Sequence, residues 1–92
     1  MEFLHYDVNA GADDVIVVSL DQQANVLLLD ETNYSAYRTG RSFHYRGGWQ
    51  KQSPAHLSPP HYGRWHVVVD LAGHAGTVRV GVNVVRQQQV FC

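Results

Sequence analysis

Hydrophobic and polar residues alternate with a period of two along most of the chain, which is typical of strands buried on one face. In residues 64–71, alternation places four side chains inward: Trp65, Val67, Val69 and Leu71. The opposite face of this segment carries His66, Val68 and Asp70. The pattern therefore predicts a half-buried strand.

The same pattern predicts strands on both sides of this segment. Residues 77–85 repeat it, with Val78, Val80, Val82 and Val84 inward. Because only a glycine-containing turn at 73–76 separates them from 64–71, we expect an antiparallel hairpin. The β-branched and leucine-rich runs at 14–20 and 25–30 suit a second hairpin, and 3–8 is a weaker first strand.

Residues 30–40 break the alternation. The segment begins with the capping-type residue Asp30 and ends at Gly40, which predicts one or two helical turns. Tyr34 and Tyr37 share one side at the i, i+3 spacing. We expect them to pack over an open end of the sheets.

Gly47 and Gly48 suit the two-residue turn of a type I′ hairpin between 41–46 and 49–53. This register puts Phe43 and Tyr45 in the core and leaves a candidate ligand-binding face of four side chains: His44, Arg46, Trp49 and Lys51. An indole beside a guanidinium can stack a ring while the positive charge holds an anion. The competing interpretation is that Arg46 only covers the apolar surface of Trp49.

These elements predict one domain over residues 1–92. Residues 55–58, between prolines, can form only an edge strand or a loop. About eight short strands and one helical turn favour an all-β fold, a small antiparallel β-sandwich of jelly-roll or Greek-key type. A chain of 92 residues buries roughly 60–65% of its unfolded surface, so we expect function on a face or rim.

Charge is strongly polarised along the chain. Seven of the eight carboxylates precede residue 32, and all seven Lys and Arg follow residue 37, although the net charge is −1. The basic half also holds most of the aromatic residues, a combination suited to an anionic or ring-bearing ligand. The simpler interpretation, which we favour, is that the acidic half folds against the basic half.

Six histidines raise the hypothesis of a metal site, because imidazole is a common metal ligand. His66 and Asp70 share a face, but four strand residues separate them by about 13 Å. We therefore expect histidines that are on the surface or hydrogen-bonded, with no metal and no cofactor. No Gly-x-Ser-x-Gly motif or phosphate-binding loop is present in the sequence, so we expect no enzyme.

The beginning of the chain lacks the basic and apolar regions of a signal peptide, and no apolar run reaches the roughly 20 residues of a membrane helix. The single cysteine, Cys92, has no partner for an internal disulfide. We expect a soluble cytoplasmic protein.

Several segments together resemble a small bacterial all-β domain family of unknown function, the DUF1883-like family, which is found alone or ahead of TIR signalling domains. The resemblance rests on 3–7, 25–30, Asn33-Tyr34, Tyr37-Arg38, Gly47-Gly48, Ser53-Pro54 and 63–71 with Gly73 and Gly76. It implies an all-β fold and a sensing or recognition role. It brings no catalytic residues.

We therefore predict a non-enzymatic recognition or sensing module, with a small anionic, nucleotide-like or sugar ligand on the face of His44, Arg46, Trp49 and Lys51. The alternative is a structural domain that self-associates through edge strands or its opposite charge halves. A metal-dependent or hydrolytic enzyme is the third hypothesis. The expected partners are that ligand, a second copy, or a fused or partner signalling protein, and neither a membrane nor a nucleic acid.

Overall fold

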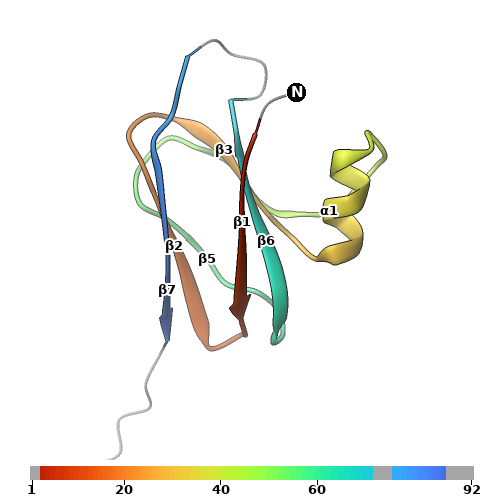
Figure 1. Ribbon diagram of the computed structural model, residues 1–92. Coiled ribbons are helices and arrows are strands. Elements are labelled where there is room, and N and C mark those ends of the chain that lie inside the picture. The colour runs from red at the N-terminus through yellow and green to blue at the C-terminus, as the bar shows by residue number, and fades with distance from the viewer. Residues whose placement is uncertain (1–2, 72–75, 87–92) are drawn as a thin grey trace, which may run out of the picture.

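The computed structural model describes residues 3–71 and 76–86, which form seven strands and one helix (Figure 1). In chain order these are β1 (Leu4–Ala10), β2 (Asp14–Leu20), β3 (Ala24–Leu29), α1 (Glu31–Arg38), β4 (Arg46–Gln50), β5 (Ala55–Leu57), β6 (Gly63–Asp70) and β7 (Val80–Arg86). The predicted turn at 73–76 lies mostly outside the described residues, and Cys92 lies outside them entirely. Within the described part of the chain, no helix is long and apolar enough to cross a membrane.

The strands form two antiparallel sheets. The four-stranded sheet has the order β1-β6-β3-β4, and the three-stranded sheet has the order β5-β2-β7. All pairs are antiparallel. The two sheets face each other, with α1 on the outer side of the four-stranded sheet (Figure 1). The predicted all-β sandwich is confirmed.

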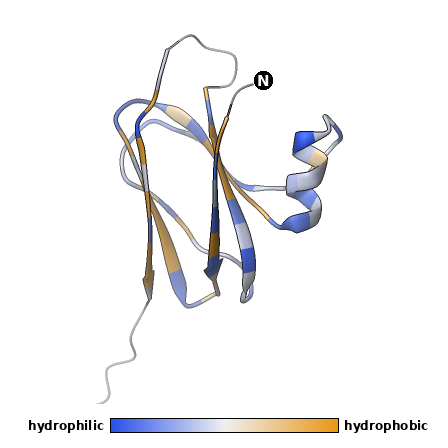
Figure 2. Cartoon of the chain, viewed as in Figure 1, coloured by the Kyte–Doolittle hydropathy of each residue, from blue (hydrophilic) through white to orange (hydrophobic). Residues whose placement is uncertain are grey.

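The main core lies between the two sheets. Its fully buried members include Ile16 and Val18 of β2, Val26 of β3 and Val67 of β6. The inward valines of β7 are partly buried against this core, as the alternation predicts. Figure 2 shows the apolar positions along the strands and mostly hydrophilic colours on α1.

β6 differs from the prediction because both of its faces are buried. Trp65, Val67 and Val69 face the main core, but His66 and Asp70 on the other face are only 2% and 5% exposed. α1 covers this second face, where a smaller cluster joins Leu27, Leu29, Tyr37 and Val68. Tyr34 and Tyr37 pack here, against the outer face of the sheet and not over an open end.

Helix α1 has the ends that its sequence predicts. The Asp30 carboxylate accepts a hydrogen bond from the Asn33 backbone N–H at 2.8 Å, which caps the first turn. At the other end, the backbone N–H of Arg41 donates to the Ala36 carbonyl at 2.9 Å, and Gly40 has a positive φ of 76°. This is a Schellman ending, in which glycine accommodates the left-handed conformation.

Both hairpins predicted from consecutive strands are wrong. β6 pairs with β1 and β3, whereas β7 pairs with β2 in the other sheet. β2 and β3 also belong to different sheets. The two strands of each predicted hairpin therefore lie in different sheets.

The predicted Gly47-Gly48 turn is also wrong. Both glycines lie inside the edge strand β4, which pairs with β3 so that Gly47 faces Leu27 and Gly48 faces Val26. Residues 41–45 form no strand, which is why the structure describes seven strands instead of about eight. The glycines are needed for a different reason, because a Cβ on Gly47 would collide with the Val26 carbonyl oxygen.

Candidate functional site

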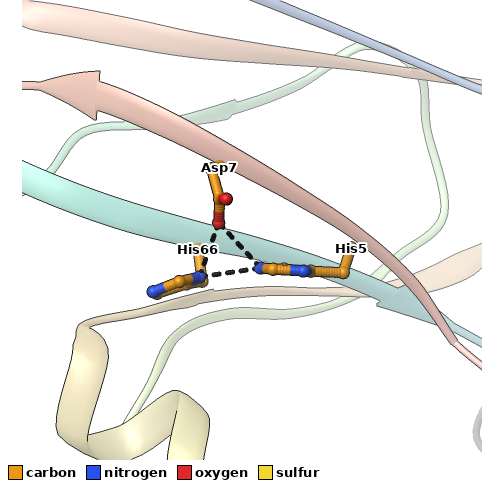
Figure 3. A group of neighbouring side chains, drawn as sticks. All are labelled: His5, Asp7 and His66. Carbon is orange, nitrogen blue, oxygen red and sulfur yellow. Dashed lines mark hydrogen bonds and ion pairs between the residues drawn. The ribbon is translucent and has the colours of Figure 1, made fainter.

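Two histidines and an aspartate meet where β1 runs beside β6. The register places Asp7 directly opposite His66, and His5 lies two residues before Asp7 on the same face of β1. Residues at i and i+2 of a strand point to one side, so all three side chains project from the outer face of the sheet toward α1. Figure 3 shows them converging on a common point.

Three atoms define this convergence. His5 Nε2 lies 2.7 Å from His66 Nδ1, and Asp7 Oδ1 lies 3.0 Å from the former and 2.8 Å from the latter. The His66 side chain is 3% exposed, whereas those of His5 and Asp7 are 27% and 43% exposed. The cluster therefore has a buried base and an edge that reaches solvent.

Three further side chains surround the cluster. Glu31 Oε1 lies 2.6 Å from His66 Nε2, on the far side of that ring from Asp7. Arg64 Nη2 donates to Asp7 Oδ2 at 2.7 Å. The Tyr34 ring stacks on both imidazoles, with centroids 4.2 Å from His5 and 4.3 Å from His66. Each member of the cluster is thus held by a neighbour outside it.

The chain reaches these positions for local reasons. Leu29, the last residue of β3, lies opposite His66 in the sheet, and Asp30 then starts α1. Glu31 therefore lies next to His66, because β3 ends beside His66 two residues before Glu31. Tyr34 follows one turn later on the same helix face.

The surroundings favour the ionised form of Asp7 and the neutral form of His5. The hydrogen bond from Arg64 lowers the pKa of Asp7, and Coulomb attraction to Arg64 acts in the same direction. Burial lowers the pKa of His5, although Asp7 opposes this shift. The cluster therefore places an anionic oxygen beside a neutral imidazole ring.

The four residues predicted as a ligand-binding face are all exposed, but the hairpin that was to join them does not form. Arg46 lies opposite Leu28, whereas Trp49 lies opposite Asn25. Leu28 faces the main core and Asn25 the other side, so Arg46 and Trp49 start from opposite faces of the sheet. The Trp49 indole N–H instead contacts Gln23 Oε1 at 3.3 Å. A ligand-binding role for His44, Arg46, Trp49 and Lys51 stays a prediction.

The cluster of His5, Asp7 and His66 was not among the predicted sites, although part of its signal is local. His5-Tyr6-Asp7 has the i, i+2 spacing that places two ligands on one face of a strand, and this pair was overlooked. The third member, His66, is distant in the sequence and depends on the pairing of β1 with β6. The pair at 5 and 7 could have been found from the sequence, but its partner could not.

No curated protein and no solved structure matches the chain. A family model described as "Domain of unknown function (DUF1883)" matches residues 1–88. This match spans all of the strands, the helix and the cluster. The chain therefore belongs to the DUF1883 family.

Proposed function

We propose that this chain is a non-enzymatic recognition or sensing module, and that its ligand is a divalent transition-metal ion bound by His5, Asp7 and His66. The proposal moves the predicted site from β4 to the face between β1, β6 and α1. It is supported by one observation above all, which is that three electron-pair donors converge with no arrangement of protons that suits them.

Consider where the protons of this cluster can be. Glu31 is an acceptor, so the His66 Nε2 beside it carries a proton. If His66 is neutral, its Nδ1 lone pair faces the ionised Asp7 Oδ1 at 2.8 Å. If His66 is also protonated at Nδ1, His5 Nε2 has an unfavourable contact in either form. A lone pair on His5 Nε2 faces the acceptor Asp7 Oδ1, whereas a proton on it faces the N–H at His66 Nδ1. Every state therefore leaves one repulsive contact.

A cation between the three atoms satisfies all of them at once. Tetrahedral zinc with bonds of 2.0–2.2 Å separates its ligand atoms by about 3.3 Å. The three atoms, at 2.7, 2.8 and 3.0 Å from one another, would need to move apart only by roughly half an ångström. Imidazole nitrogens with a carboxylate oxygen suit zinc and the neighbouring first-row divalent ions.

The surroundings resemble those of metal-binding histidines in general. A ligand histidine usually donates its other ring N–H to a carboxylate or carbonyl, which fixes the ring and the tautomer. Glu31 provides that acceptor for His66. Arg64 orients the Asp7 carboxylate through its second oxygen, leaving Oδ1 to face the histidines.

Calorimetric titration of zinc into metal-free protein tests the proposal. We expect one ion per chain in the wild type and a loss of affinity of about tenfold or more in Asp7→Asn and His5→Ala, each of which removes one ligand. Both side chains are partly exposed, so these variants should fold. His56→Ala is the matched control, because His56 is exposed on β5 of the other sheet.

Cobalt(II) gives a second measurement, since its visible absorption reports the ligands directly. We expect intense tetrahedral-type bands that weaken in Asp7→Asn but not in His56→Ala. Absence of stoichiometric binding by the wild type, or equal binding by all four proteins, would overturn the proposal.

A further inference from the structure

Helix α1 touches the cluster through two side chains of one face. Glu31 lies 2.6 Å from His66 Nε2, and the Tyr34 ring lies nearly parallel to both imidazoles, at 16° to His5 and 10° to His66. Figure 3 shows the start of the helix beside His66. The ligands of the proposed metal site thus form part of the surface on which α1 rests.

Helix α1 is short, and its two halves are held by different contacts. It contains eight residues, too few for a stable helix by itself in water. Its buried residues are Ala36 and Tyr37, both in its second half. The first turn is held by the Asp30 cap, by the contacts of Glu31 and Tyr34 with the cluster, by the Phe3 ring against Tyr34, and by the His44 backbone N–H, which donates to Asn33 Oδ1.

We propose that metal occupancy of the cluster is coupled to the docking of α1, so that this helix reports whether the metal is bound; this inference rests on the proposed function. A bound cation withdraws electron density from the His66 ring, which makes its Nε2–H a stronger donor to Glu31. It also fixes both imidazoles in the plane on which Tyr34 stacks. The empty cluster, with its repulsive contact, offers a less ordered surface.

Coupling of this kind is reciprocal. If the metal stabilises the docked helix, the docked helix raises the metal affinity by the same factor. Glu31 is then a positioning residue, which acts on the metal through His66 without binding it.

Hydrogen exchange with and without zinc tests the coupling. In the wild type we expect zinc to slow the exchange of the amides of residues 34–41 about fivefold or more, relative to the amides of β2 in the other sheet. In Glu31→Gln we expect an affinity about tenfold lower and little added protection at saturating zinc. Asp13→Asn removes the same charge from an exposed turn and should behave as the wild type.

The outcomes separate the two proposals. Zinc that binds the wild type but leaves α1 exchange unchanged, or changes it equally in Glu31→Gln, overturns the coupling and leaves the metal site standing. Zinc that does not bind at all overturns both. Because Glu31 is 67% exposed, Glu31→Gln should fold, and its circular dichroism spectrum without metal confirms that it does.

Discussion

His66 places an ionisable ring between the apolar neighbours Trp65 and Val67 of β6. Its neighbours Trp65 and Val67 face the main core, while the imidazole itself is covered by α1. A buried polar group costs free energy unless it has partners, and the two nitrogens of His66 lie 2.8 and 2.6 Å from carboxylate oxygens of Asp7 and Glu31. A valine would serve packing at this position better, so the histidine points to a role beyond stability.

Tyr37 and Asp70 form a second polar contact under the helix, separate from the cluster. The Tyr37 hydroxyl donates to Asp70 Oδ2 at 2.7 Å, and Asn25 Nδ2 donates to Oδ1 at 3.3 Å. Burial, followed by the hydrogen bond to Asp70, raises the pKa of Tyr37. This contact links the second half of α1 to the end of β6.

Tyr37→Phe tests the contribution of this hydroxyl. Its removal deprives a buried carboxylate of one donor, so we expect a loss of about 1–3 kcal/mol in the free energy of unfolding at pH 7. The raised pKa favours the neutral form in the folded state, so the stabilisation is complete below the unfolded value of about 10 and is lost as pH rises above it. The stability gap between wild type and Tyr37→Phe should therefore narrow as pH rises above about 10 in urea unfolding.

Tyr62→Phe is the control for alkaline titration. The Tyr62 ring is 70% exposed, so this variant should follow the wild type at every pH. A gap for Tyr37→Phe that stays constant up to pH 11 would show that the hydroxyl is not held as described.

At the scale of elements, β4 is an edge strand built around two glycines. Gly47 and Gly48 have φ values of 108° and 130°, a conformation that side chains rarely adopt. Gly47 also lies against the backbone of Val26 in β3. This close approach lets β4 continue the sheet beside a strand whose side chains are almost wholly buried.

Gly47→Ala should therefore destabilise the fold by about 3 kcal/mol, since it combines backbone strain with a collision against a main-chain oxygen. Gly81→Ala is the matched control on the edge strand β7. A Cβ there would meet Ser19 Cβ at 3.8 Å, an ordinary contact, so we expect a change within about 0.5 kcal/mol. Equal unfolding midpoints for the two variants in chemical denaturation would contradict the geometry given for β4.

The elements also show that the sequence predicts the direction of side chains within a strand better than the pairing between strands. Alternation placed β2 at residues 14–20 and gave the inward faces of β6 and β7, because each side chain's direction follows from the local backbone. Pairing is not local. Gly47-Gly48 suits a turn and a close backbone contact equally well, and only the partner strand β3 decides between them. The same reason kept His66 from being matched with His5 and Asp7.

At the scale of the whole molecule, some charges of the acidic half pair with charges of the basic half within the same chain. The acidic strand β1 pairs with the basic end of β6, where Asp7 and Arg64 form an ion pair at 2.7 Å. The strand β3 of the acidic half also pairs with β4, which begins at Arg46, although β3 itself carries no charged side chain. This arrangement supports the view that one half folds against the other, and self-association through the charge halves stays a prediction.

The way in which the chain alternates between sheets has a consequence for how the protein folds. Among the strands described, β1, β3, β4 and β6 lie in one sheet and β2, β5 and β7 in the other, and no pair is closed by a tight turn. The pairing of β1 with β6 must bring together residues such as Asp7 and His66 from opposite ends of the chain. Such pairings lose much chain entropy before they gain contacts, so no hairpin can serve as a local starting point.

We therefore expect refolding with a time constant of about a millisecond or longer, followed in stopped flow by the fluorescence of Trp65, which is 5% exposed in the core. Microsecond refolding would contradict this topology. Until β7 has arrived, the free edge of β2 in the three-stranded sheet stays open to other chains. Synthesis of this small domain thus passes through a period in which its most apolar strands are made but not yet covered.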